Sequence, residues 1–215
     1  MRTASFSLLT ILCLMLTVAP AIAQGYSNGP INGTTDAWTI NFGFSVSDSF
    51  TCASDCTVDG LHIGVWLFPG DNVGSVEMLL GSSSFGNQYG DLVLNATGHT
   101  DLGINQYGYD IQRVDFMAGQ VLVPQGTNWL TLQNAVETQF GDPIYWDENS
   151  GPSSAFENSL GSIPSEAFTL NGCSGCVCGV PGPDCGPPIP EPSSIMLFGS
   201  GILGLVGVLR RKLSL

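Results

Sequence analysis

Basic residues are scarce in this sequence. Lysine and arginine together number five in 215 residues, against eighteen aspartates and glutamates, and the formal net charge is −13 at pH 7. Four of the five lie near the two ends, which leaves Arg113 alone in the long middle part against seventeen acidic residues, a charge of about −16. Such a surface repels nucleic acid and anionic lipid, so neither is expected as its partner. It suits divalent cations, basic partners or simple solubility.

Helical patterning and catalytic motifs are also missing. No stretch of the middle part spaces its apolar residues as on one face of a helix, which excludes a helical bundle. Of the two histidines, His62 is expected mid-strand, partly buried and hydrogen-bonded, and His99 in a turn. No nucleophile elbow or HExxH motif is found. A Ser-His-Asp triad stays open, because its members meet only in space.

The chain begins with the features of a secretory signal. Arg2 supplies a positive charge, residues 6–18 form an apolar run, and Ala21-Ile22-Ala23 is a small-x-small cleavage site. We therefore interpret residues 1–23 as a signal peptide that is removed, so that the mature chain begins at Gln24. The part between this signal and the tail has about 165 residues, enough for one domain with its own core.

The tail has three sections in order. Pro190-Glu191-Pro192 comes first, residues 195–209 follow without a charge or a proline, and Arg210, Arg211 and Lys212 close the run. As a helix the apolar run would span roughly 22 Å. It approaches the ~30 Å of a bilayer core once flanking residues and snorkelling basic side chains are included. We expect a transmembrane helix whose basic residues stop transfer and stay on the cytoplasmic side.

This arrangement resembles the PEP-CTERM sorting signal of exported bacterial proteins, over residues 189–213. The resemblance implies an exosortase, a membrane peptidase or transpeptidase, as the partner that recognises the Pro-Glu-Pro motif. It also implies a Gram-negative-type cell and an exopolysaccharide or biofilm setting. The protein would be anchored in the inner membrane before sorting, and would then lie at the cell surface or in the extracellular matrix. An ordinary C-terminal membrane anchor is the alternative.

Between the two ends, apolar residues alternate with the period of two that is typical of strands. Residues 38–46 are predicted as one such strand, and residues 61–68 are apolar on both faces, as inside a sandwich. We predict an all-β, jelly-roll-like β-sandwich ectodomain at residues 24–170 and a Cys/Gly/Pro-rich linker at residues 171–188. Shorter strands are predicted at residues 75–80, 91–97, 107–116, 120–123, 127–134, 142–146 and 166–170.

Six cysteines lie in the exported part. Because that compartment is oxidising, disulfide bonds are the expected state. Cys52 and Cys56 flank three residues and are expected to close a small loop. Four more cysteines allow three pairings, and a zinc site in the first three of them is the alternative. These four are Cys173, Cys176, Cys178 and Cys185.

The richest polar cluster is Tyr145, Trp146, Asp147 and Glu148. Exposed aromatic rings beside carboxylates suit stacking on and hydrogen bonding to a sugar, and carboxylates with loop carbonyls suit Ca²⁺. Two carboxylates could also hydrolyse a glycosidic bond. However, Asp147 and Glu148 are neighbours on an extended strand and would point to opposite faces. The competing interpretation places Trp146 in the core and has the acids cap a turn.

These features predict a secreted, surface- or matrix-associated protein without enzymatic activity, which binds exopolysaccharide or calcium. No cofactor other than Ca²⁺ is suggested by the sequence. The alternative is a β-sandwich hydrolase that acts on matrix polysaccharide.

Overall fold

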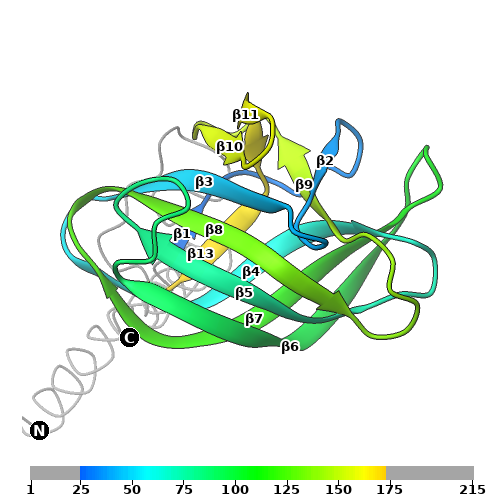
Figure 1. Cartoon of the computed structure of the whole chain (residues 1–215), viewed down its shortest axis with the longest axis horizontal. Coiled ribbons are helices and arrows are strands. Elements are labelled where there is room, and N and C mark those ends of the chain that lie inside the picture. Colours follow the sequence, from blue (N-terminus) through cyan, green and yellow to red (C-terminus); the bar gives the residue numbers. More distant parts are fainter. Residues whose placement is uncertain (1–24, 173–215) are drawn as a thin grey trace, which may run out of the picture.

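The computed structural model describes residues 25–172 (Figure 1). The predicted signal peptide, the sorting signal with its transmembrane helix, and the four linker cysteines lie outside the described residues. This described part contains no helix, and therefore none long and apolar enough to cross a membrane.

Hydrogen bonds join thirteen strands into one antiparallel sheet, so the all-β prediction is confirmed. The sheet follows the path β1-β13-β4-β7-β6-β5-β8-β3-β10-β11, and β9 is attached beside it through β4, β2 and β12. The strands are β1 (Gly25–Ser27), β2 (Ala37–Thr39), β3 (Ser45–Cys52), β4 (Cys56–Leu67), β5 (Val73–Gly81), β6 (Gly90–Ile104), β7 (Asp110–Val123), β8 (Gly126–Glu137), β9 (Tyr145–Asn149), β10 (Ala155–Glu157), β11 (Gly161–Ile163), β12 (Ser165–Glu166) and β13 (Phe168–Asn171).

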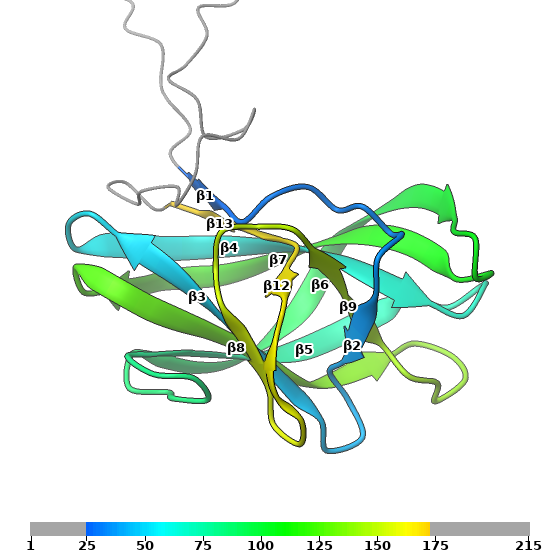
Figure 2. The ribbon, with the colours of Figure 1, turned by 90° about the horizontal axis from the view of Figure 1, so that it is seen from above.

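The sheet curls because β6 changes partners along its length. Its first part pairs with β5 up to Asn95, and from Ala96 onwards it pairs with β7. The pairing with β7 is interrupted between Ala96 and Gly98, and such irregularities bend and twist a strand. As a result β13, β4 and β7 face β3, β8 and β5 across the interior (Figure 2).

The core fills the space inside this curl. Leu61, Ile63, Val65 and Leu67 point inward from β4 and are buried. They share one face of the strand that the sequence predicted to be apolar on both faces. Buried leucines and valines of β3, β5 and β8 meet them from the other half. The opposite face of β4 carries His62, Gly64 and Trp66, and the functional residues discussed below lie on that outer face.

The single strand predicted at residues 38–46 is wrong. The chain forms β2, turns at Phe42 and Gly43, and begins β3 at Ser45. Both turn residues have positive φ (55° and 87°), a conformation that glycine adopts readily, and Phe42 is 63% exposed. Alternating apolar residues continue through this turn in the sequence, so the periodicity could not reveal it.

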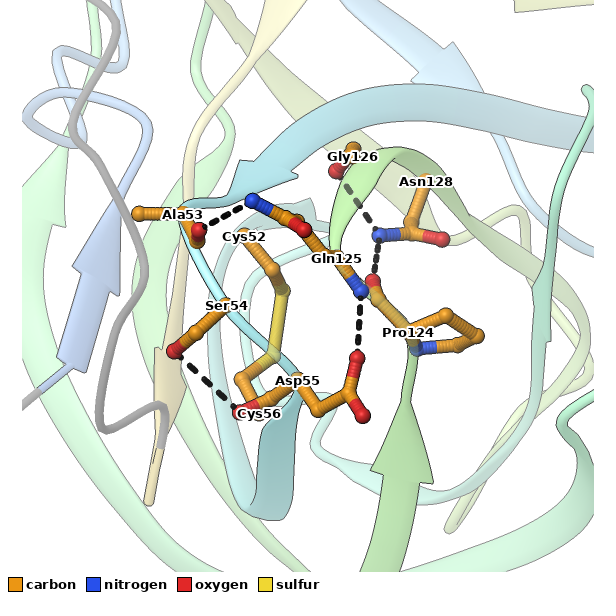
Figure 3. The surroundings of a disulfide bond; sticks show 9 residues. All are labelled: Cys52, Ala53, Ser54, Asp55, Cys56, Pro124, Gln125, Gly126 and Asn128. Atoms are coloured by element: carbon orange, nitrogen blue, oxygen red, sulfur yellow. Dashed lines mark hydrogen bonds between the residues drawn. A yellow bond between two sulfur atoms is a disulfide. The ribbon is translucent and has the colours of Figure 1, made fainter.

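A disulfide bond closes the loop between β3 and β4 (Figure 3). It joins Cys52 to Cys56, whose Cα atoms are 6.2 Å apart. Gln125, from the neighbouring β7–β8 turn, donates its backbone N–H to Asp55 and its side-chain amide to the Ala53 carbonyl, at 3.0 and 2.7 Å. The disulfide and these two hydrogen bonds therefore hold the β3–β4 loop against the β7–β8 turn, where the chain passes from one half of the curl to the other.

A buried polar seam closes the other side of the curl. Asn28, just after β1, places Nδ2 3.0 Å from the Asp48 carboxylate of β3 and 2.7 Å from each of the Ser153 and Ser165 hydroxyls. Asp48 also accepts the backbone N–H of Glu166 in β12, at 2.7 Å. These contacts join segments from both halves of the sheet, where no ladder of backbone hydrogen bonds connects them.

Two carboxyl groups in the seam are strongly perturbed. Burial raises the pKa of Asp48 to about 6, although hydrogen bonds from Ser153, Glu166 and Ser49 oppose the shift. Burial, and then the nearby Asp48 and Glu148, raise the pKa of Glu166 well above its usual value. Among residues 25–172, neither carboxyl oxygen of Glu166 finds a hydrogen-bond partner. Both groups therefore hold their protons to a higher pH in the folded protein than in the unfolded chain.

We predict that replacing both Cys52 and Cys56 by serine lowers the free energy of unfolding by about 2 kcal/mol, because the disulfide closes a loop of roughly five residues. Urea unfolding of the two proteins measures this difference. Reductant should lower the stability of the wild type to that of the variant and should leave the variant unchanged. A wild type that does not respond to reductant would contradict the bond.

We predict that the contribution of Asp48 to the free energy of unfolding falls as pH rises. Because folding raises the pKa of Asp48 from 3.8 to about 6, its contribution is fully present below the lower value and is lost as pH passes the higher one. The loss is about 3 kcal/mol. The free energy of unfolding of the wild type relative to Asp48→Asn should therefore drop by this amount between pH 3.5 and pH 8. Asp91→Asn, at an exposed acid, is the control, and a pH-independent difference for Asp48→Asn would refute the assignment.

Candidate functional site

Trp146 lies in the core, which corrects the expectation that its ring could stack on a sugar. The side chain is fully buried, its Nε1–H donates to the Ala167 carbonyl at 2.9 Å, and its ring centroid lies 5.8 Å from that of Phe168. A ligand could reach this ring only if the domain opened.

Asp147 and Glu148 point to opposite sides of β9, and each carboxylate is bound to protein donors. Asp147 accepts the backbone N–H groups of Asn32 and Gly33 and the Nε1–H of Trp66, at 2.8, 2.9 and 2.6 Å. Glu148 accepts the Nε1–H of Trp38 at 3.0 Å. Both residues are buried, so they cannot act together as the acid pair of a hydrolase. Asp147 instead holds a turn, as the competing interpretation expected.

The same carboxylates were the expected ligands for Ca²⁺. Burial raises the pKa of Asp147 even though Trp66, Asn32 and Gly33 donate hydrogen bonds to it. Over residues 25–172, no three His, Cys, Asp or Glu side chains are grouped so that they could hold a metal ion.

Trp66, held by Asp147, lies beneath a group of aromatic rings on the outer face of β4. Tyr107 stacks on it with centroids 5.8 Å apart, and Tyr109 lies at 5.9 Å. Tyr109 in turn meets Phe68 and Tyr145 edge to face, at 5.3 and 5.6 Å. We call Trp66, Phe68, Tyr107, Tyr109 and Tyr145 the aromatic platform.

The tip of the β6–β7 hairpin fixes the two platform tyrosines that it carries. The side-chain oxygen of Asn105 accepts the backbone N–H groups of Tyr107 and Tyr109, each at 3.0 Å. The amide of Asn105 donates to the Gly33 carbonyl at 3.1 Å, in the turn that Asp147 holds. The buried carboxylate of Asp147 therefore holds both the Trp66 indole and the turn at Gly33, which in turn supports the hairpin tip through Asn105.

The platform combines a rigid base with accessible rings. Trp66 is 5% exposed, whereas Tyr107 is 58% and Phe68 is 40% exposed. Tyr145 is half-buried, and burial together with Tyr109 and Asp142 raises the pKa of its hydroxyl, so the ring stays neutral. Aromatic rings of this kind offer an apolar face for stacking and, in tyrosine, a hydroxyl at the edge.

The sequence identified one platform residue, Tyr145, and missed the other four. The available signal was the alternation that placed Trp66 and Phe68 together on one face of their strand. The stacking itself depends on Tyr107 and Tyr109, which reach β4 only through a hairpin.

The two histidines have different outcomes. His62 lies mid-strand in β4, half-buried between Asp115 and Asn171, as predicted. His99 lies within β6, and its Nε2 is 2.8 Å from the Val73 carbonyl oxygen, so the predicted turn there is wrong.

Comparison with known proteins gives one positive finding, at the tail. The family model of the PEP-CTERM protein-sorting motif matches residues 188–212, which coincides with the predicted sorting signal. Curated proteins gave no match to the chain. The motif implies export, processing by an exosortase and sorting to the cell surface. The chain therefore carries a PEP-CTERM sorting motif at residues 188–212, and this motif supports an exported protein that is sorted by an exosortase.

Proposed function

We propose that this protein is a non-enzymatic component of the cell surface or extracellular matrix that binds exopolysaccharide through the aromatic platform. In this proposal the curled sheet is a β-sandwich ectodomain at residues 24–170, and the disulfide-bonded linker at residues 171–188 holds it away from the membrane. The C-terminal helix anchors the protein in the inner membrane until an exosortase acts.

The aromatic platform is the observation that carries the binding proposal. Tyr107 and Phe68 are exposed large rings, and exposed aromatic side chains that are packed on a fixed base mark binding surfaces more than isolated ones do. Because Trp66 is held through Asp147, the rings need little ordering when a ligand arrives, and this lowers the entropic cost of binding.

The charge of the protein restricts the polymer. The described residues contain a single arginine and no lysine. Asp110 directly follows Tyr109 of the platform, and Asp142 lies three residues before Tyr145. A polymer of uronic acids would be repelled by such a surface. We therefore expect an uncharged exopolysaccharide.

Tyr107→Ala should weaken retention on an uncharged exopolysaccharide matrix about fivefold, since a lost stacking contact is worth about 1 kcal/mol. Affinity electrophoresis with the purified ectodomain measures the retention. Phe42→Ala, which removes an equally exposed ring from the β2–β3 turn, is the matched control. Equal retention of wild type and Tyr107→Ala would remove the platform from the proposal.

The sorting step has its own test. Glu191→Ala should leave the protein uncleaved in the membrane fraction of cells that contain the exosortase, because the change removes the charged centre of the Pro-Glu-Pro motif. Immunoblotting of fractionated cells measures the mass and location of the protein. Asp184→Asn, an acidic position outside the motif, should be processed like the wild type. Normal processing of Glu191→Ala would contradict recognition at this motif.

A further inference from the structure

A groove with both polar and apolar lining lies on the outer face of β4, β7 and β13. Its volume is about 650 Å³, and His62, Arg113, Asp59 and Asn171 are among the residues that line it. Neither the sorting motif nor the aromatic platform accounts for it.

The polar side chains at the groove form one connected network. Nδ1 of His62 lies 2.5 Å from a carboxylate oxygen of Asp115, and Arg113 donates to both oxygens of that carboxylate, at 2.8 and 3.3 Å. Nδ2 of Asn171 lies 2.6 Å from Nε2 of His62. In this orientation the amide donates to Nε2, so the ring proton is on Nδ1 and is donated to Asp115.

Glycines let this network lie flat against the sheet. A Cβ atom on Gly98 would be 3.1 Å from Oδ2 of Asp115, and one on Gly60 would be 3.2 Å from Nδ2 of Asn171. Because no side chain stands at these positions, the carboxylate and the amide rest on the backbone. Burial alone would raise the pKa of Asp115, but the hydrogen bonds from Arg113 and His62 lower it below its usual value, so the Asp115 carboxylate stays ionised and keeps its two partners.

The charges in the groove favour an uncharged ligand. Arg113 is the only lysine or arginine of residues 25–172, and its charge is balanced by Asp115. Asp59 adds a further negative charge to the lining, so an anion gains nothing there. The guanidinium, amide and carboxylate groups together offer both donors and acceptors, which suits hydroxyl groups that can do both.

The groove and the aromatic platform share the outer face of β4. His62 belongs to the groove and Trp66 to the platform, and four residues along a strand correspond to about 13 Å. Ile31, which is half-buried, packs over Gly64 between them and also lines the groove. An extended ligand on the platform would therefore pass over one apolar side chain before it reached the network.

We propose that the groove lined by His62, Arg113 and Asn171, which Asp115 holds in place through His62 and Arg113, is a subsite for the same uncharged polysaccharide, with one chain lying across the platform, over Ile31 and into the groove. This inference rests on the proposed function. It adds that recognition requires several sugar units and excludes uronates.

Isothermal titration calorimetry with defined oligosaccharides tests the subsite. The probes are gluco-, manno- and xylo-oligosaccharides of two and six units, together with a hexauronate. We expect the wild type to bind at least one uncharged hexasaccharide about tenfold or more tightly than its disaccharide, and to bind the hexauronate undetectably.

Variants then separate the subsite from the platform. Asn171→Ala and Arg113→Gln should each lower the affinity for the hexasaccharide severalfold and leave the affinity for the disaccharide unchanged, whereas Tyr107→Ala should weaken both. Gln120→Ala, an exposed polar position of β7 away from the network, is the control. Thermal unfolding of each variant establishes that it is folded.

The outcomes distinguish the two proposals. The subsite is overturned, and the platform is kept, if binding depends on Tyr107 but the hexasaccharide binds no more tightly than the disaccharide. The same conclusion holds if Asn171→Ala and Arg113→Gln leave the affinity for the hexasaccharide unchanged. Binding of the hexauronate as tightly as the uncharged hexasaccharide overturns the charge argument. Failure of every oligosaccharide to bind overturns both proposals.

Discussion

The structure depends on the buried contact between Asn28 and Asp48. Ladders of backbone hydrogen bonds hold each neighbouring pair of strands, but no ladder joins β3 to the end of β1 or to β12. The contact between Asn28 and Asp48 connects these segments, with the help of Ser165 and Glu166. A buried polar group without a partner is costly, so each member of the seam fixes the position of the others. The seam fixes how the two halves of the curl meet, and it buries Asp48 and Glu166, whose pKa values are raised by that burial.

The closed curl in turn fixes the outer face of β4. Asn28 leads into the segment that contains Ile31 and Gly33, and this segment lies across that face. Asp147 binds the segment and Trp66 together, so the aromatic platform depends on a residue that no ligand touches. Buried acids in this protein therefore serve as structural anchors, while the accessible chemistry lies in tyrosines and in the network around Asp115.

The sequence predicted the all-β class correctly. Alternation at residues 61–68 sorted the side chains of β4 onto two faces, because the period of a strand is fixed by its geometry, but both faces are apolar and the pattern did not tell which one is the core side. It failed at Phe42, where a turn interrupts an alternating pattern, and it left Trp146 open between a core position and an exposed ring beside two acids. Periodicity cannot tell which face of a short strand is covered by another segment. The groove brings together residues that are far apart in the sequence, such as His62 and Asn171, so no local sequence pattern could predict it.

The tail was the most predictable part, because a sorting signal is read as a linear motif and needs no folding to be recognised. The central claim, that the outer face of β4 binds an uncharged polysaccharide, can be tested through the four tryptophans of the chain. In an NMR titration of the ¹⁵N-labelled ectodomain with the uncharged hexasaccharide, the indole N–H signal of Trp66 and the side-chain amide of Asn171 should shift. The signal of Trp129, which packs against Phe156 in the other half of the curl, should not. Unchanged signals from Trp66 and Asn171, or shifts confined to Trp129, would contradict the account.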